Sequence, residues 1–494
     1  MAEARRRPDP ELRDADAWRR GQGPPDDEGP TRPVPPVPTA ALRTSGPSPV
    51  VRLFGSNNFF RLWLAQVVSA LGDWIGFFAI VAIATRIGGE SSGVAIGVVM
   101  TARILPGFFL APVAGVLLDR WNRKRVMVTC DIGRGLTLAV LPFVTTIPQL
   151  VVASFVLEVL TLMWSPAKEA EVPNLVPERH LATANSLSLI AAYGTFPVAA
   201  AIFAGLAGVA GRLADNESLA FLPLTHESLA VYFDVVTFFL SALLISTMAL
   251  IGGRPRTTRR RRIDFAQTFH ELKEGWYFIV VNPRVRAVMV GLGTGLIGGG
   301  MLVPLGQLFT REVLGGGTAG FGLVLFALGT GMAVGVVVVS VFQARLPKPR
   351  AFTVAVVVAG GSLLLGASMS SLAPALVLVA LLGAAAGCAY VLGFTILQEN
   401  VSDHIRGRTF TALYTVVRLC LLIAFAVGPF LSGVLGGVSS RLFGGEISLG
   451  ELTISVPGVR LTLWLASIII IVAGVLAGLV LAERENGERD PVRP

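Results

Sequence analysis

Four charged residues lie inside long apolar segments of this 494-residue chain: Asp73, Arg103, Glu158 and Arg418. A charge at the centre of a membrane helix costs at least roughly 2.5 kcal/mol on insertion scales, so such a residue marks either a functional site or a paired structural group. A carboxylate that is alternately hydrated and buried can take up and release a proton. We therefore expect proton or cargo chemistry at these four positions.

Depth along the helices relates the first three of these residues. Asp73 lies about 20 Å and Arg103 about 17 Å from the outer ends of their helices at 1.5 Å per residue, so the two side chains can pair. Such a pair is either a static ion pair or a coupling site. Glu158 has no evident cation in the sequence, so we expect it to carry the proton, while Asp73 binds a cationic or polar cargo group or holds Arg103. Asp234 is interpreted as structural.

Polar residues at helical spacing share one helix face with three of these four charged residues. The faces are Gln66, Ser69 and Asp73; Ser154, Glu158, Thr161 and Ser165; and Thr411, Tyr414 and Arg418. Polar stripes on otherwise apolar helices predict a hydrated cavity between those helices. We include Gln66 among the residues expected to contact cargo.

Composition indicates the elements that must position these side chains. Hydrophobic residues make up 53% of the chain and charged residues only 15%, against about 45–50% and about 25% in soluble domains. Several apolar stretches reach the roughly 20 residues that span a bilayer. We predict an all-α polytopic membrane protein with twelve transmembrane helices, at 58–86, 93–118, 126–146, 150–167, 182–211, 229–252, 285–311, 318–344, 351–371, 373–399, 408–437 and 459–482.

The predicted organisation has two six-helix halves and three flanking or linking segments. The halves are 53–252 and 285–484. Residues 1–52 carry 11 of the 30 prolines within a charged sequence and are expected to form a disordered cytoplasmic tail. The basic linker 253–284 contains apolar residues spaced by three and four between Ile263 and Ile279, which predicts an amphipathic helix on the membrane surface. Residues 485–494 form a second cytoplasmic tail.

Basic residues gather in alternate loops, which sets the predicted orientation. The loops 119–125, 168–181, 253–284, 345–350 and 400–407 are rich in Arg and Lys, so the positive-inside rule places both termini in the cytoplasm. This location also explains the net charge of +9 without nucleic acid. The run Arg259 to Arg262 is expected to contact anionic lipids, with a regulatory site as the alternative.

An internal repeat has an offset of 225 residues. Gly97 aligns with Gly322, Arg120 with Arg345, Arg123 with Lys348, Arg125 with Arg350, Glu178 with Asp403 and Gly208 with Gly433. Repeated six-helix halves are typical of transporters whose substrate site lies near the middle of the membrane between the halves.

The turn after the second predicted helix carries a family signature. Gly115, Asp119, Arg120, Arg123, Lys124 and Arg125 match G-x-x-x-D-R-x-x-R-R-R, and on these residues the chain resembles the major facilitator superfamily over about 53–484. "ARILPGFFLAPVAGVLLDR", "SPAKEAEVPNLVPERHLATANSL" and "LQENVSDHIRGRTFTAL" are similar to the branch of the enterobactin exporter and of macrolide and multidrug efflux permeases.

The signature is expected to form a cytoplasmic gate. Asp119 can approach the positive end of a neighbouring helix, and the arginines can reach acidic residues or lipid phosphates. The resemblance implies that this neighbour starts at "RGRTF", Arg406 to Phe410, and we assign Asp131, Arg134, Asp403, Arg406 and Arg408 to the gate network. Ala344 replaces the second-half equivalent of Asp119, which favours asymmetric gating. In the alternative interpretation the basic residues only orient the loop.

The resemblance implies a secondary active exporter of an amphiphilic small molecule, drug or siderophore in type, that works by proton antiport in the bacterial inner membrane. A lipid or lysophospholipid carrier of the same fold is the alternative, followed by a non-transporting scaffold or receptor. An enzyme is not expected: the four histidines fall in loops without metal-ligand spacing, and no nucleotide-binding loop is present. Protons and anionic lipids are the expected partners, the proton gradient replaces a cofactor, and the protein is expected to be a monomer.

Overall fold

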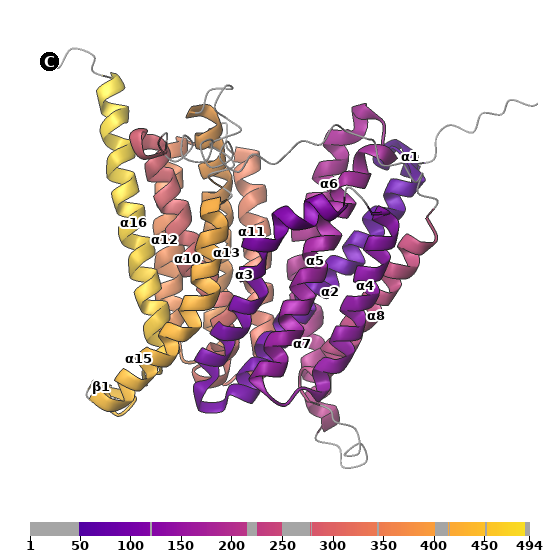
Figure 1. Cartoon of the computed structure of the whole chain (residues 1–494). Coiled ribbons are helices and arrows are strands. Elements are labelled where there is room, and N and C mark those ends of the chain that lie inside the picture. Colours follow the sequence, from indigo (N-terminus) through magenta and orange to yellow (C-terminus); the bar gives the residue numbers. More distant parts are fainter. Residues whose placement is uncertain are drawn as a thin grey trace, which may run out of the picture. The chain divides into compact units, whose positions relative to one another are not determined.

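Apolar helices form nearly all of the described structure (Figure 1). The computed structural model describes residues 49–118, 121–214, 225–248, 277, 279–342, 345–400, 413, 415–449 and 452–489. Eleven stretches of these residues are long and apolar enough to cross a membrane, and the first, Asn57–Gly107, contains two helices, so the described helices make twelve passes. The predicted all-α polytopic fold is confirmed.

The first six passes are built from seven helices, preceded by the short α1 (Pro49–Phe54). They are α2 (Asn57–Gly88), α3 (Ser92–Leu118), α4 (Arg123–Val140), α5 (Ile147–Leu175), α6 (Leu181–Tyr193), α7 (Thr195–Ala214) and α8 (Ser228–Ser246). The fifth pass is α6 followed by α7. Figure 1 shows α1 and the C-terminal end of α16 on the same side of the helices, and we call this side the terminal side.

The last six passes follow the same order. They are α10 (Pro283–Glu312), α11 (Gly317–Phe342), α12 (Lys348–Ser368), α13 (Leu372–Asn400), the pass Thr415–Leu442 and α16 (Gly458–Arg489). The eleventh pass contains a π-helical turn, η7 (Ile423–Val427), and α15 (Gly428–Phe443). Strands β1 (Glu446–Leu449) and β2 (Leu452–Ser455) pair antiparallel between α15 and α16.

Local sequence sets the helix starts. The Ser56 hydroxyl accepts a hydrogen bond from the Phe59 N–H at the start of α2, and Asn122 accepts one from the Arg125 N–H at the start of α4. Thr146 and Gln149 form a capping box at α5. Each cap satisfies a backbone donor that the first helical turn leaves open.

Three segments differ from the sequence expectation. The fourth pass was predicted to end at 167, but α5 continues to Leu175 through Pro166 and Pro173, because its last turns bury one side although the apolar run has ended. Helix α1 lies partly within the predicted tail, and Phe54 packs against Phe60 and Trp63. The predicted outer loop after α15 contains the β1–β2 hairpin. The amphipathic helix predicted from Ile263 lies almost entirely outside the described residues.

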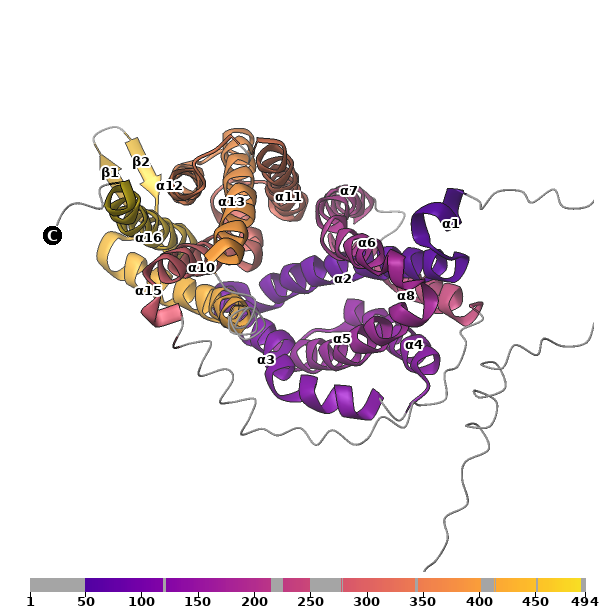
Figure 2. The same ribbon diagram turned by 90° about the horizontal axis from the view of Figure 1, so that it is seen from above.

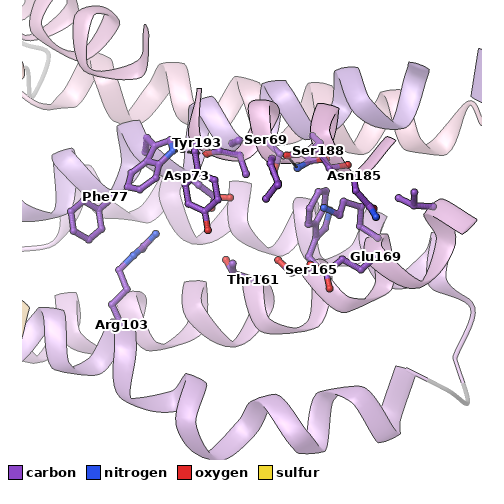
Figure 3. Close-up of a pocket in the computed structure, with 18 residues that line it drawn as sticks. Ser69, Asp73, Phe77, Arg103, Thr161, Ser165, Glu169, Asn185, Ser188 and Tyr193 are labelled. Carbon is purple, nitrogen blue, oxygen red and sulfur yellow. Dashed lines mark hydrogen bonds between the residues drawn. The ribbon is translucent and has the colours of Figure 1, made fainter. Parts of the chain in front are cut away.

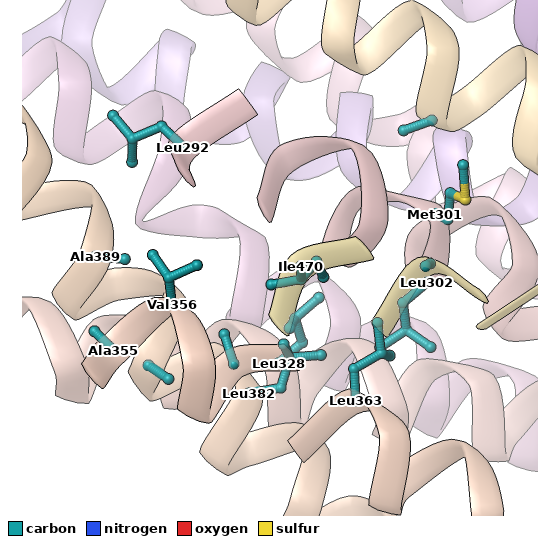
Figure 4. Close-up of a cluster of buried hydrophobic side chains, with 14 of the residues drawn as sticks. Leu292, Met301, Leu302, Leu328, Ala355, Val356, Leu363, Leu382, Ala389 and Ile470 are labelled. Carbon is teal, nitrogen blue, oxygen red and sulfur yellow. The ribbon is translucent and has the colours of Figure 1, made fainter. Parts of the chain in front are cut away.

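The two halves repeat helix by helix. The first four passes begin at 57, 92, 123 and 147, and their counterparts begin at 283, 317, 348 and 372. In Figure 2, helices α2 to α8 form one group and helices α10 to α13 with α16 form another. The second group contains a large apolar core that includes Leu302, Val356 and Leu382 (Figure 4).

Glycines allow helices of the two halves to approach closely. A Cβ at Gly97 of α3 would lie 2.9 Å from the Ala426 carbonyl oxygen, and one at Gly322 of α11 would lie 2.6 Å from the Ala204 side chain on α7. Both distances are too short for any side chain. The pairs α3 with η7 and α7 with α11 therefore hold the halves together on the side opposite to the terminal side.

Candidate functional site

A cavity of about 690 Å³ lies within the first half, between α2, α3, α5 and α6. Its walls are formed by Gln66, Ser69, Ala70, Asp73, Trp74, Phe77, Arg103, Thr161, Trp164, Ser165, Lys168, Glu169, Val172, Asn185, Ser188, Leu189, Ala192 and Tyr193 (Figure 3). The volume falls within the roughly 300–1,000 Å³ of small-molecule sites, and the mixture of aromatic and polar groups is typical of them.

The predicted polar face of α2 lines this cavity as expected. Gln66, Ser69 and Asp73 all contribute to its wall. The Gln66 amide donates to the Ser188 carbonyl oxygen at 2.9 Å, and the Trp74 indole N–H donates to the Ala192 carbonyl oxygen at 3.1 Å. These hydrogen bonds fix α2 against α6, which ends at a break beside Gly194.

Asp73 pairs with Arg134, and this finding corrects the expected pair with Arg103. The Arg134 Nη1 atom lies 3.2 Å from each carboxylate oxygen of Asp73. The Arg134 side chain is fully buried, whereas the Asp73 side chain is 33% exposed. The depth of two residues along their helices shows that they lie at the same level, but it does not show which face of each helix points inward. Arg134 on α4 points its guanidinium towards α2.

Arg134 also binds Asp131, so the structure places these two predicted gate residues in a buried network with Asp73. The Arg134 Nη2 atom pairs with the Asp131 carboxylate and donates to the Ser69 hydroxyl at 3.2 Å. Asp131 further accepts hydrogen bonds from the Ser241 hydroxyl at 2.8 Å and the Trp164 indole N–H at 3.3 Å. This buried network joins α2, α4, α5 and α8 behind the cavity wall, because a buried charge needs partners on every side.

Arg103 projects from α3 into the cavity towards Phe77 (Figure 3). Its guanidinium carbon lies 5.6 Å from the centre of the Phe77 ring, within the range of a cation–π contact. Its Nη1 atom is buried and has no hydrogen-bond partner among the described residues. The cavity therefore contains an open, positively charged donor.

Glu158 lies beside Arg103, which corrects the expectation that it has no nearby cation. A Cβ at Gly107 would lie 3.8 Å from the Glu158 Oε1 atom, and Arg103 is one turn away from Gly107 on α3. No ion pair within 4.0 Å joins the two side chains in the described part of the chain. Thr161 and Ser165, predicted to share the face of Glu158, line the cavity.

Asp234 is fully buried and lies directly against α2. Its carboxylate occupies the space that a Cβ would need at Gly72 or Gly76. Thr237 donates to its Oδ1 atom at 3.1 Å, while Oδ2 has no hydrogen-bond partner among the described residues. These contacts fit the structural role that the sequence suggested, because the glycines and the short carboxylate allow α2 and α8 to pack closely.

Lys168 lines the cavity from α5 and is only 8% exposed. It is not among the residues that the sequence predicted for the site. It continues the face of Thr161 and Ser165 by three residues, so helical spacing could have identified it. The expected end of the helix at 167 placed it in a loop instead.

Arg123 and Lys124, two of the predicted gate residues, form their contacts within the first half. The Arg123 guanidinium donates to the Ala170 carbonyl oxygen at 2.8 Å and pairs with Glu171 at 3.4 Å. The Lys124 ammonium donates to the Met248 carbonyl oxygen at 2.6 Å. Cations at the carbonyl ends of α5 and α8 also complement the helix dipoles.

The other predicted gate residues are either exposed or outside the described part of the chain. Arg125 is exposed. The surroundings of Gly115, and all of Asp119, Arg120, Asp403, Arg406 and Arg408, lie outside the described residues. Arg418, expected to face a cavity, is exposed and does not line the cavity of the first half.

A match to a family model adds to this geometry. Residues 62–424 match the model described as Major Facilitator Superfamily. The chain is 22% identical to macrolide efflux protein A of Streptococcus pyogenes, over 76% of this chain and 90% of that protein. It is 25% identical to the multidrug efflux pump Tap of Mycobacterium bovis, over 75% of this chain and 84% of that protein.

A solved structure supports the fold alone. The bacterial homologue of the human lysosomal transporter Spinster, in an inward-facing and unoccupied conformation, superposes with a TM-score of 0.66 at 16% identity. The alignment covers 88% of this chain and 98% of that chain. The resemblance seen in the sequence signature is confirmed by these matches.

Proposed function

Because the chain belongs to the major facilitator superfamily, we propose that it exports an amphiphilic small molecule by alternating access in exchange for protons. The family and the apolar helices make it a multi-pass membrane transporter. Relatives named for efflux support the outward direction, and their bacterial sources support an inner-membrane location. The basic residues of alternate loops support the placement of both termini in the cytoplasm. We further propose that it acts as a monomer in contact with anionic lipids and needs only the proton gradient as energy source.

The cavity of the first half is the observation that carries this proposal. It combines aromatic side chains such as Trp74 and Tyr193 with polar groups such as Asn185 and Thr161. Such walls suit a molecule with an apolar body and a few polar atoms. Substrate sites of repeated transporters are expected between the halves, whereas this cavity lies within the first half. We propose that cargo binds in it because the predicted polar face of α2 forms part of its wall.

Glu158 is the residue that we propose to carry the coupling proton. It lies on α5 beside the cavity, and its nearest described cation, Arg103, leaves it without an ion pair within 4.0 Å. Asp73 is less suited to this role, because both of its oxygens face Arg134. We assign Asp73 to holding the network behind the cavity rather than to binding a cationic cargo.

Flux measurements in proteoliposomes test the proposal. The purified full-length protein is reconstituted, and a panel of macrolides, aromatic dyes, siderophores and lysophospholipids is followed with and without an imposed pH gradient. We expect saturable transport of one or more amphiphilic small molecules, accelerated by the gradient. Selective movement of lysophospholipid would favour the lipid carrier, and the absence of saturable flux for every compound would contradict the transport proposal.

A further inference from the structure

An unpartnered donor in the cavity wall points to one feature of the cargo. The Arg103 Nη1 atom is buried, yet no described residue accepts a hydrogen bond from it. Most buried polar groups in proteins have a partner, and leaving one open costs roughly 1–3 kcal/mol or more for a charged group. Arg103 lines the cavity, so a ligand that reaches this side chain can supply the missing acceptor.

The carboxylates around the cavity do not fill this position. Asp73 faces Arg134 with both oxygens, and Asp131 accepts from Arg134, Ser241 and Trp164. Glu158 lies close enough to balance the charge of Arg103, but no ion pair within 4.0 Å joins them in the described part of the chain. The guanidinium thus has a countercharge nearby and a hydrogen-bond donor still open, since it carries five N–H groups.

The fold itself does not require an arginine at this position. With the repeat offset of 225 residues, Arg103 corresponds to Leu328 and Glu158 to Gly383. The Leu328 carbonyl oxygen lies against Gly383 in a tight apolar contact between α11 and α13. The same helix pair therefore packs without either charge in the second half, so the pair in the first half is available for binding.

We propose that the Arg103 Nη1 atom donates a hydrogen bond to an uncharged acceptor oxygen of the cargo, such as a carbonyl, ester or ether oxygen. This inference rests on the proposed function of the cavity. While Glu158 is ionised it balances the guanidinium, so a cargo carboxylate would then add an uncompensated charge at this end. Phe77, which contacts Arg103, and Trp74 on the same helix provide the adjoining surface for an apolar cargo body.

Lys168 is the other cation of the cavity, and it lies apart from Arg103. It follows Glu158 by ten residues on α5, or about 15 Å at 1.5 Å per residue. A carboxylate probe that bound at Lys168 would not depend on Arg103. The two cations can therefore be separated by experiment.

Three radiolabelled probes with one naphthyl body test the proposal: a methyl ester, a carboxylate and a methyl analogue. Binding to the purified full-length protein is measured by scintillation proximity, and flux is measured separately in proteoliposomes. Arg103→Leu carries the residue of the other half, and Arg441→Leu makes the same change at an exposed position of α15 outside the cavity. Thermal unfolding of each variant checks that the fold is retained.

We expect Arg103→Leu to weaken binding of the ester about tenfold or more, as the loss of a charged hydrogen bond predicts, and to leave the methyl analogue within about twofold. Arg441→Leu should change neither. Equal weakening of ester and methyl analogue, no change for either, or a loss confined to the carboxylate would overturn the inference. Ester binding that depends on Arg103 without flux of any probe would support the inference while contradicting the exporter proposal.

Discussion

The two halves of this transporter share one scaffold but differ in their interiors. Their first four passes start at matching positions, yet the charged residues of the first half have small or apolar counterparts in the second. At an offset of 225, Asp73 corresponds to Gly298, Arg103 to Leu328, Asp131 to Val356, Arg134 to Ala359 and Glu158 to Gly383. The second half therefore forms without these charges, whereas the first half gathers them around the cavity and in the network behind its wall.

Glycines replace the charged site where α11 meets α13. Gly331 and Gly335 lie against the carbonyl oxygens of Ala380 and Ala384, and Gly383 and Gly387 lie against those of Leu328 and Met332. Small residues at four-residue spacing allow membrane helices to touch along their backbones. In the first half, Glu158 and Leu162 replace these last two glycines, so α3 and α5 leave room for side chains and for the cavity.

The largest effect is expected when the buried network of the first half is broken. Arg134→Leu leaves Asp131 buried without its cation and Asp73 without its partner. Removing one partner of a buried ion pair costs about 3–5 kcal/mol, so the free energy of unfolding should fall by that amount. Denaturant unfolding in detergent micelles measures it.

A double variant sharpens the same comparison. Asp131→Val with Arg134→Ala introduces the two residues of the second half and removes both buried charges together. Because replacing a buried pair by apolar residues is often nearly neutral, the double variant should recover at least half of the lost stability. A double variant as unstable as Arg134→Leu would mean that the network holds the fold of this half.

An intermediate effect is expected from crowding the glycine contact of the second half. In Gly331→Ala the new Cβ meets the Ala380 carbonyl oxygen, and overpacking of this kind typically costs about 1–3 kcal/mol. Gly299→Ala on α10 is the matched control, because nothing lies within 4 Å of its new Cβ. Thermal unfolding in detergent should separate the two variants. Equal midpoints would contradict the close helix contact.

The smallest effect is expected at the terminal side, where both halves contain a similar ion pair. Lys348 at the start of α12 pairs with Glu399 on α13, as Arg123 at the start of α4 pairs with Glu171 on α5. The Glu399 side chain is half exposed, so Lys348→Met should change the free energy of unfolding by less than about 1 kcal/mol. Arg123→Met should cost more, since Glu171 is nearly buried. The reverse order in denaturant unfolding would show that the repeat does not extend to these contacts.

Hydropathy and helical spacing predicted the twelve passes and the polar face of α2, because each depends on residues close in sequence. The partner of Asp73 could not be predicted in this way. Depth along a helix follows from residue counting, but the choice between Arg103 and Arg134 depends on how α2, α3 and α4 are rotated against one another. Lys168 was missed for a different reason: α5 continues through two prolines after its apolar pattern has ended.

Proton-driven accumulation by a Glu158→Gln variant tests the central claim most directly. The amide keeps the size of the side chain but cannot exchange a proton at neutral pH. Wild-type protein and the variant are reconstituted in proteoliposomes and compared under an imposed pH difference, with downhill cargo exchange measured in the same preparations. We predict that the variant retains exchange while its accumulation ratio falls to about one, because binding survives and coupling does not. A variant that still concentrates cargo against its gradient would contradict the assignment of proton coupling to Glu158 in the first half.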